Sequence, residues 1–371
     1  MTSPKLFLNT LKMNKVDFFV GVPDSLLKNL SDYMSMKNCK NIITANEGTA
    51  LSIAAGYNIA TNKIALVYLQ NSGLGNLINP LLSLTDKNVF KIPAIILVGW
   101  RGEPNTKDEP QHFAQGQVTE KIIKIIKKKT FILDGNEKND LKKVINAINY
   151  CKRAQEITFI LVKKNTFSKI TNYKFNSKYL VSKERALNLI INNLNNNYRI
   201  ISTTGTISRQ LFELRKEKKQ GHKKDLMIVG SMGHASQIAL GIAMNSKKKI
   251  ICIDGDGSLL MHMGGLATIG RLNLKNFIYV LLNNGCHESV GGQPTGGFEI
   301  NFRKIAKACN FKHISNILDT KKKIEKYFKR KIVLKGSLFV EIRINTLLKK
   351  NLPRPDISPL KNKIIFKKYL K

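Results

Sequence analysis

The chain has 371 residues, 43% of them hydrophobic, which is enough for two or three ordinary globular domains. Its 62 Lys and Arg residues far outnumber the 25 Asp and Glu residues, giving a formal net charge of +37. No segment approaches the roughly 20 apolar residues of a membrane helix, and the N-terminus lacks the apolar stretch of a secretory signal. Five scattered cysteines without a CxxC pair fit reduced thiols. We therefore expect a cytoplasmic protein with no membrane partner.

The positive charge allows two interpretations. A large basic excess can indicate a nucleic-acid or anionic-membrane partner. The basic residues are, however, spread along the chain without interleaved aromatic residues, and no helix-turn-helix or RNP-like motif occurs. We interpret the charge as a general surface property with no specific nucleic-acid partner. Modest steering of an anionic substrate is compatible with either interpretation.

The first part of the chain alternates apolar, strand-like runs with amphipathic helical stretches. This rhythm predicts βαβ units and a largely parallel sheet. A polar stretch then predicts a linker. The expected order is helix 4–13, strand 17–20, helix 25–34, strand 41–44, helix 48–60, strand 63–69, helix 74–84, strand 94–98, helix 140–151 and strand 158–162.

The second part restarts the same rhythm after the linker. We expect helices at 183–193, 207–215, 235–244, 264–271, 302–309 and 321–330, and strands at 199–202, 226–229, 249–253, 277–282 and 337–342. The predicted fold class is therefore α/β, with two doubly wound parallel-sheet domains. The predicted limits are 1–165 for the first domain, 166–182 for the linker, and 183–371 for the second domain with a basic C-terminal tail.

A Gly-Asp-Gly-Ser turn and an Asn-Asn pair carry the clearest chemical signal. Asp256 follows one apolar run, and Asn284 follows another 28 residues later. That separation accommodates a strand, a crossover helix and a neighbouring parallel strand, so both side chains should emerge at one sheet edge. A carboxylate and an amide oxygen there suit Mg²⁺ bound to phosphate oxygens. Gly255 and Gly257 let the backbone approach a phosphate, and Ser258 adds a hydroxyl donor.

Glu47 is the candidate acid of the first domain. It follows a predicted strand and opens a helix of small and apolar residues. One interpretation is a capping acid favoured by the helix dipole. The other is a buried acid that hydrogen-bonds a ring nitrogen of a cofactor. Its occurrence in the first domain, with the metal pattern in the second, favours the cofactor interpretation.

This arrangement resembles the thiamine-diphosphate-dependent decarboxylases. The resemblance implies a pyrimidine-binding domain followed by a diphosphate-binding domain, with a homodimer or higher homo-oligomer as the active form. The short two-domain arrangement, together with sequence motifs that begin at Gly21, Gln70, Arg101 and Asn283, resembles the phosphonopyruvate decarboxylases. It implies an enzyme of phosphonate biosynthesis whose substrate is a 2-oxo acid carrying a phosphonate. The alternatives are a sulfopyruvate decarboxylase with fused domains and a nucleic-acid-binding protein on an inactive scaffold.

The resemblance also implies roles for individual residues. Glu47 would pair with N1′ of the aminopyrimidine ring of thiamine diphosphate. Gly230 would accept from the 4′-amino group through its carbonyl, and Met232 would lie between the two rings of the cofactor. The ligands of Mg²⁺ would be the Asp256 and Asn284 side chains and the Cys286 carbonyl.

The remaining candidates handle protons and the phosphonate. Asp24 follows a proline before a helix, so it is either an N-cap or a proton-relay acid. His112, in a predicted loop rich in proline and charge, and His287, just past the metal segment, are either catalytic or solvated. A phosphonate needs cationic or N–H donors. The candidates for this role are Arg101, Lys107 and Arg209, although most basic residues of such a chain lie at the surface.

Overall fold

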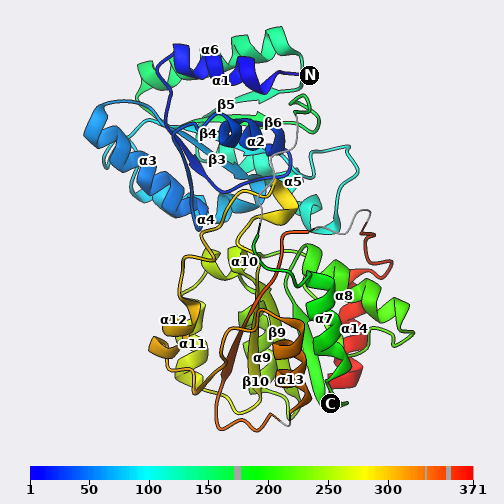
Figure 1. Ribbon diagram of the computed structural model, residues 1–371. Helices are drawn as coiled ribbons and strands as arrows, with labels where there is room; N and C mark the ends of the chain where they lie inside the picture. Colours follow the sequence, from blue (N-terminus) through cyan, green and yellow to red (C-terminus); the bar gives the residue numbers. More distant parts are fainter. Residues whose placement is uncertain (171–176, 331, 348–351, 371) are drawn as a thin grey trace. The chain divides into compact units, whose positions relative to one another are not determined.

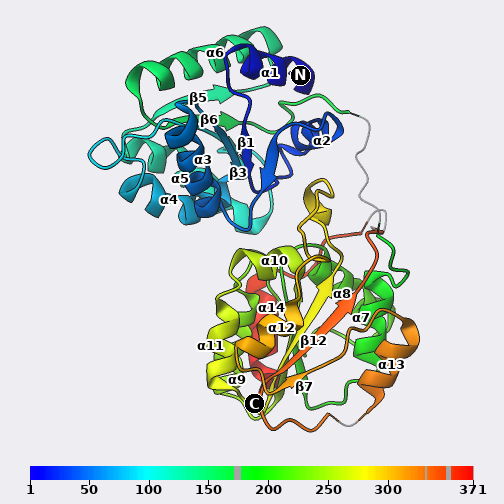
Figure 2. The same ribbon diagram turned by 60° about the vertical axis from the view of Figure 1, so that its left-hand side comes forward.

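The computed structural model describes residues 1–170, 177–330, 332–347 and 352–370, which form two compact units (Figures 1 and 2). The first unit comprises Met1–Lys174 with Ser289–Gln293, and the second comprises Phe175–Glu288 with Pro294–Lys371. The domain limits and the linker expected at 166–182 stay predictions. Residues 171–176 of that linker lie outside the described residues.

The first unit is built on a six-stranded, all-parallel sheet of order β2-β1-β3-β4-β6-β5. Its strands are β1 (Phe19–Gly21), β2 (Asn41–Ile43), β3 (Leu66–Gln70), β4 (Ile95–Gly99), β5 (Lys129–Leu133) and β6 (Thr158–Val162). Its helices are α1 (Pro4–Met13), α2 (Lys28–Met36), α3 (Glu47–Thr61), the short η1 (Asn71–Gly73), α4 (Leu74–Ser83), α5 (Pro110–Ile125) and α6 (Glu137–Ala154).

Helices cover both faces of this sheet because its strands are apolar on both sides. Along β3, Leu66 and Tyr68 join a core with α1, α2 and α6, whereas Val67 and Leu69 join a core with α3, α4 and α5. Figure 1 shows α1 and α6 on one side of the strands and α3 and α4 on the other. The carboxyl ends of the strands are left for polar side chains.

The second unit repeats this plan with a parallel sheet of order β11-β12-β10-β9-β7-β8. Its strands are β7 (Tyr198–Ser202), β8 (Asp225–Met227), β9 (Lys249–Gly255), β10 (Phe277–Asn283), β11 (His313–Ile314) and β12 (Leu338–Arg343). Its helices are α7 (Lys183–Asn192), α8 (Thr206–Glu217), α9 (Ala235–Met244), α10 (Asp256–Met261), α11 (Gly265–Leu272), η2 (Glu288–Val290), α12 (Phe302–Ala308), α13 (Lys321–Lys329) and α14 (Pro359–Leu370).

Alternation along β9 again divides the core into two layers. Ile251 and Ile253 pack with α7, α8 and α13, whereas Ile250 and Cys252 pack with α9, α11 and α12. Figure 2 shows α7 and α13 on one side of this sheet and α9 and α11 on the other. The predicted fold class, with two doubly wound parallel sheets, is confirmed.

Several elements differ from the sequence-based expectation. Residues 110–125, expected to include a loop, form α5, and residues 129–133 add the edge strand β5. The basic tail contains α14, which packs on β8 through Phe366 and Asn362. No helix within the described part of the chain is long and apolar enough to span a membrane.

Candidate active site

Asp256 and Asn284 come together at the carboxyl edge of the second sheet. Strands β9 and β10 are parallel neighbours, and Gly255 is in register with Leu282. Asp256 then begins α10, and Asn284 follows the last residue of β10. The backbone N–H of Asn284 donates to Oδ1 of Asp256 at 3.4 Å. The spacing predicts that the two residues meet at this edge, and the Asn284 backbone does contact the Asp256 carboxylate there.

The Asp256 carboxylate lies in a closely fitted, buried position. Thr295 donates its hydroxyl to Oδ2, and a Cβ added to Gly297 would lie 2.5 Å from that same oxygen. Burial raises the pKa of Asp256 to about 6. A buried carboxylate of this kind gains stability when a cation binds, because the positive charge offsets the lost hydration.

The loop after β10 is closed at its base by backbone contacts. Cys286 pairs with Pro294, and the Thr295 N–H donates to the Gly285 carbonyl at 2.9 Å. The Cys286 N–H donates to Oδ1 of Asn284 at 3.1 Å. These contacts hold the loop that carries Asn284 and Cys286, and carboxylate, amide and carbonyl oxygens are ligand types that a hard cation such as Mg²⁺ prefers. Among the described residues no group of three or more His, Cys, Asp or Glu side chains could hold a metal, so this site would depend on one carboxylate.

Two further turns, those after β7 and β8, meet the start of α10 at the same edge of the second unit. The Ser258 hydroxyl contacts the Thr203 hydroxyl at 3.1 Å and accepts from the Gly233 N–H at 3.0 Å. Thr204 donates to the Val229 carbonyl at 2.8 Å, which ties down the turn that holds Gly230 and Met232. Ser258 therefore joins the turns after β7, β8 and β9.

Glu47 occupies the corresponding edge of the first unit. It is the first residue of α3, its side chain is buried, and Nδ2 of Asn76 donates to its Oε2 at 2.7 Å. Burial raises the pKa of the carboxyl group. Gly73 leaves room for this carboxylate, since a Cβ there would lie 2.1 Å from Oε1 of Glu47. The N-cap of α3 is Asn46, and Glu47 is the acidic residue of the first turn of the helix.

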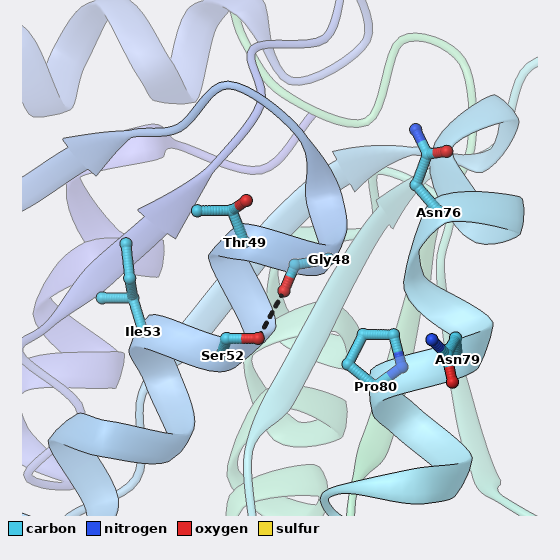
Figure 3. Close-up of a pocket in the computed structure, with 7 residues that line it drawn as sticks. All are labelled: Gly48, Thr49, Ser52, Ile53, Asn76, Asn79 and Pro80. Carbon is cyan, nitrogen blue, oxygen red and sulfur yellow. Dashed lines mark hydrogen bonds between the residues drawn. The ribbon is translucent and has the colours of Figure 1, made fainter. Parts of the chain in front are cut away.

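An open groove of about 610 Å³ runs between α3 and α4 beside Glu47. Asn76 lines the groove and also contacts Glu47. Figure 3 shows the Ser52 hydroxyl donating a hydrogen bond to the Gly48 carbonyl on α3, with Pro80 of α4 on the opposite side of the groove. The helices approach closely here because Gly48 has no side chain: a Cβ would lie 2.9 Å from the Asn76 carbonyl oxygen.

Asp24 and Arg101 are each held by hydrogen bonds to separate partners in the first unit. Asp24 is fully buried and accepts from Nε2 of Gln70 at 2.6 Å and from the Leu26 N–H at 2.9 Å. Burial raises the pKa of Asp24. Arg101 donates to both oxygens of Asp108 and, at 2.8 Å, to the Ser25 hydroxyl. Asp24 thus makes the backbone contacts of a capping acid while its burial suits a proton relay.

The other predicted residues lie in different environments. His112 is buried in the first turn of α5, so the expected loop position is wrong. His287 lies against Gly257, where a Cβ would be 3.1 Å from the imidazole, and burial lowers the pKa of His287 to about 4. Lys107 is exposed. Arg209 donates to the carbonyls of Leu352 and Pro353, which ties it to the C-terminal segment.

Sequence reasoning missed residues that hold the predicted ones in place. Thr295 supports Asp256, Asn76 supports Glu47, and Gln70 supports Asp24. Thr295 and Gln70 lie in the sequence motifs that begin at Asn283 and Gln70 and resemble the decarboxylases. These motifs could therefore have indicated both residues. Asn76 also lies in the motif that begins at Gln70. Its partner Glu47 is 29 residues away, however, and the contact between them depends on the packing of α4 on α3.

Both units of the chain match known proteins. Residues 1–123 match the N-terminal TPP binding domain of thiamine pyrophosphate enzymes, and residues 202–342 match the C-terminal TPP binding domain. The chain is 28% identical to phosphonopyruvate decarboxylase of Streptomyces viridochromogenes, with 91% of this chain and 87% of the relative covered. It is also 28% identical to sulfopyruvate decarboxylase of Methanosarcina acetivorans, with 95% and 93% covered.

A third relative is the sulfopyruvate decarboxylase subunit beta of Methanocaldococcus jannaschii, at 38% identity over 38% of this chain and 71% of the subunit. With both binding domains matched and this relative largely covered, the chain belongs to the thiamine pyrophosphate enzyme family. Within that family it is a decarboxylase of the phosphonopyruvate and sulfopyruvate decarboxylase type.

Proposed function

We propose that this protein decarboxylates 3-phosphonopyruvate to phosphonoacetaldehyde and CO₂, using thiamine diphosphate and Mg²⁺, in phosphonate biosynthesis. The observation that carries the cofactor assignment is the contact of the Asn284 backbone N–H with the Asp256 carboxylate, just beyond the ends of two adjacent parallel strands. The substrate assignment is supported by the likeness to a phosphonopyruvate decarboxylase over 91% of the chain. We further propose a cytoplasmic homodimer or larger homo-oligomer, as the family resemblance implies.

The second unit would hold the diphosphate end of the cofactor. Asp256, Asn284 and the Cys286 carbonyl would bind Mg²⁺, while Gly255 and Gly257 leave the backbone accessible to phosphate oxygens. Ser258 keeps the surrounding turns together through Thr203 and Gly233. The Gly230 carbonyl and the Met232 side chain would orient the rings, on the turn that Thr204 fixes.

The first unit would control protons at the ring end of the cofactor. When bound, thiamine diphosphate supplies the electron sink for loss of CO₂. Glu47 would hold a proton at N1′, and its burial favours that sharing because the ionised form is poorly hydrated. Asp24 would relay a proton near the reacting carbon, with Gln70 fixing its orientation. His287, whose pKa burial lowers to about 4, would be a neutral imidazole at pH 7 next to Gly257.

Arg101 is the candidate that best suits the phosphonate. A guanidinium group has five N–H donors, and the contacts to Asp108 and Ser25 use three of them. The other two N–H groups can donate to phosphonate oxygens while Asp108 holds the guanidinium group in place. Lys107 is exposed, and Arg209 already donates to a backbone carbonyl of the C-terminal segment. Both are therefore weaker candidates than Arg101.

Sulfopyruvate is the second candidate substrate. A sulfopyruvate decarboxylase matches both halves of this chain at the same 28% identity, so the single-chain layout does not distinguish the two acids. A phosphonate can carry one more negative charge than a sulfonate. The Arg101 guanidinium group and the net charge of +37 favour phosphonopyruvate, the more highly charged acid.

A steady-state comparison tests the substrate proposal. The purified protein, supplied with thiamine diphosphate and Mg²⁺, is assayed with phosphonopyruvate, sulfopyruvate and pyruvate. We expect the highest kcat/KM with phosphonopyruvate. A preference for sulfopyruvate or pyruvate would refute the substrate proposal and leave the cofactor proposal intact.

A further inference from the structure

Glu288 lies four residues beyond Asn284, in a buried cluster of hydrogen-bond donors within the second unit. Its Oε2 accepts from Nζ of Lys183, from the Thr206 hydroxyl at 3.1 Å and from Nδ2 of Asn284 at 3.4 Å. The Lys183 and Glu288 side chains are only 9% and 7% exposed. Two helix starts, those of α7 and α8, therefore hold this carboxylate against the candidate metal ligand.

The chemistry of these groups fixes which way the Asn284 amide points. A carboxylate can only accept hydrogen bonds, so Glu288 must face the NH₂ group of the amide. The Cys286 N–H can only donate, and it contacts the amide oxygen at 3.1 Å. Both contacts select the same orientation. The second lone pair of the Asn284 oxygen then remains for a cation. The Asp256 carboxylate is held to the same residue by the Asn284 backbone N–H at 3.4 Å.

We propose that Glu288 is a positioning residue of the metal site: it keeps the Asn284 oxygen directed to the cation, and Lys183 in turn holds Glu288. This inference rests on the proposed use of thiamine diphosphate and Mg²⁺. A glutamine at position 288 has nearly the same shape but offers both a donor and an acceptor. It therefore removes the Glu288 constraint on the amide without leaving a cavity, and only the Cys286 N–H then selects the orientation.

The inference is tested by Mn²⁺ titration, followed by the electron paramagnetic resonance of the free ion, with the full chain and saturating thiamine diphosphate. Glu288→Gln should weaken Mn²⁺ binding roughly 10- to 100-fold, the range typical of groups that orient metal ligands. Asp225→Asn is the matched control, because it breaks the buried ion pair with Arg215 in the same unit, away from the loop after β10. It should lower thermal stability and leave the Mn²⁺ affinity unchanged.

A double-mutant cycle with Asn284→Ala separates a positioning role from a merely structural one. If Glu288 acts through the Asn284 amide, adding Glu288→Gln to Asn284→Ala should not weaken Mn²⁺ binding further. Wild-type affinity in Glu288→Gln, or an undiminished effect in the Asn284→Ala background, would overturn the inference. Failure of the wild-type protein to bind Mn²⁺ with thiamine diphosphate would instead refute the proposed cofactor use, and the inference with it.

Discussion

Replacing Gly73 by alanine should displace the acid that we assign to the cofactor ring. Gly73 ends η1 with φ −81° and ψ −5°, a backbone conformation that alanine adopts without strain. The new Cβ, however, would lie 2.1 Å from Oε1 and 2.3 Å from the carboxyl carbon of Glu47. Ordinary contact begins at 3.4 Å, so the carboxylate must move by more than about 1 Å.

The functional loss follows from that displacement. A misplacement of about 1 Å at a catalytic group can lower the rate roughly 100-fold, equivalent to about 2.7 kcal/mol of transition-state stabilisation. The assay is kcat for CO₂ release from phosphonopyruvate at saturating thiamine diphosphate and Mg²⁺. Circular dichroism and thermal unfolding of the same samples show whether the fold is retained.

Gly75→Ala is the matched control for this substitution. Gly75 is exposed on α4, two residues away, and a Cβ there meets nothing within 4 Å. It should leave kcat unchanged and slightly stabilise the helix. Equal activity of the Gly73→Ala and Gly75→Ala proteins would refute the assignment of Glu47 to the cofactor ring.

Three other changes test separate parts of the account. Glu47→Gln should abolish turnover with the fold intact, and an unchanged rate would refute its role. Because the pKa of Asp256 is raised to about 6, protonation at lower pH removes the metal-binding charge. The Mg²⁺ affinity, measured calorimetrically with thiamine diphosphate, should therefore fall roughly tenfold from pH 7 to pH 5. An affinity that does not change with pH would contradict this. Asn362→Ala, which frees the Met227 N–H and the Asp225 carbonyl of edge strand β8, should lower the free energy of unfolding in urea by about 2–4 kcal/mol. The exposed Lys363→Ala is its control, and equal stability of the two variants would contradict the expected loss.

The sequence was sufficient for the parallel sheets and for the meeting of Asp256 with Asn284. Apolar runs separated by amphipathic helices identify buried parallel strands, and consecutive crossovers bring their polar ends to one edge. The pattern failed where a strand is only partly covered. Residues 129–133 form edge strand β5 beside a lysine-rich stretch, so their apolar signal is weak. Helix α14 was missed for a related reason, since only Asn362 and Phe366 are buried among its lysines.

Contacts between distant segments were the part of the site that sequence could not supply. Asn76 reaches Glu47, and Lys183 reaches Glu288 across 105 positions, only because helices pack at particular angles. Closer in sequence, the contact of Arg101 with Asp108 depends on the conformation of the turn that follows β4. Residue type indicates which chemistry a side chain can perform, whereas tertiary packing determines which partners it has.

The most direct test measures CO₂ release from phosphonopyruvate by protein stripped of cofactor and metal, before and after thiamine diphosphate and Mg²⁺ are restored together. The account predicts negligible release before and steady turnover after, with neither addition sufficient alone. Turnover that persists without both additions, or none when both are present, would contradict it.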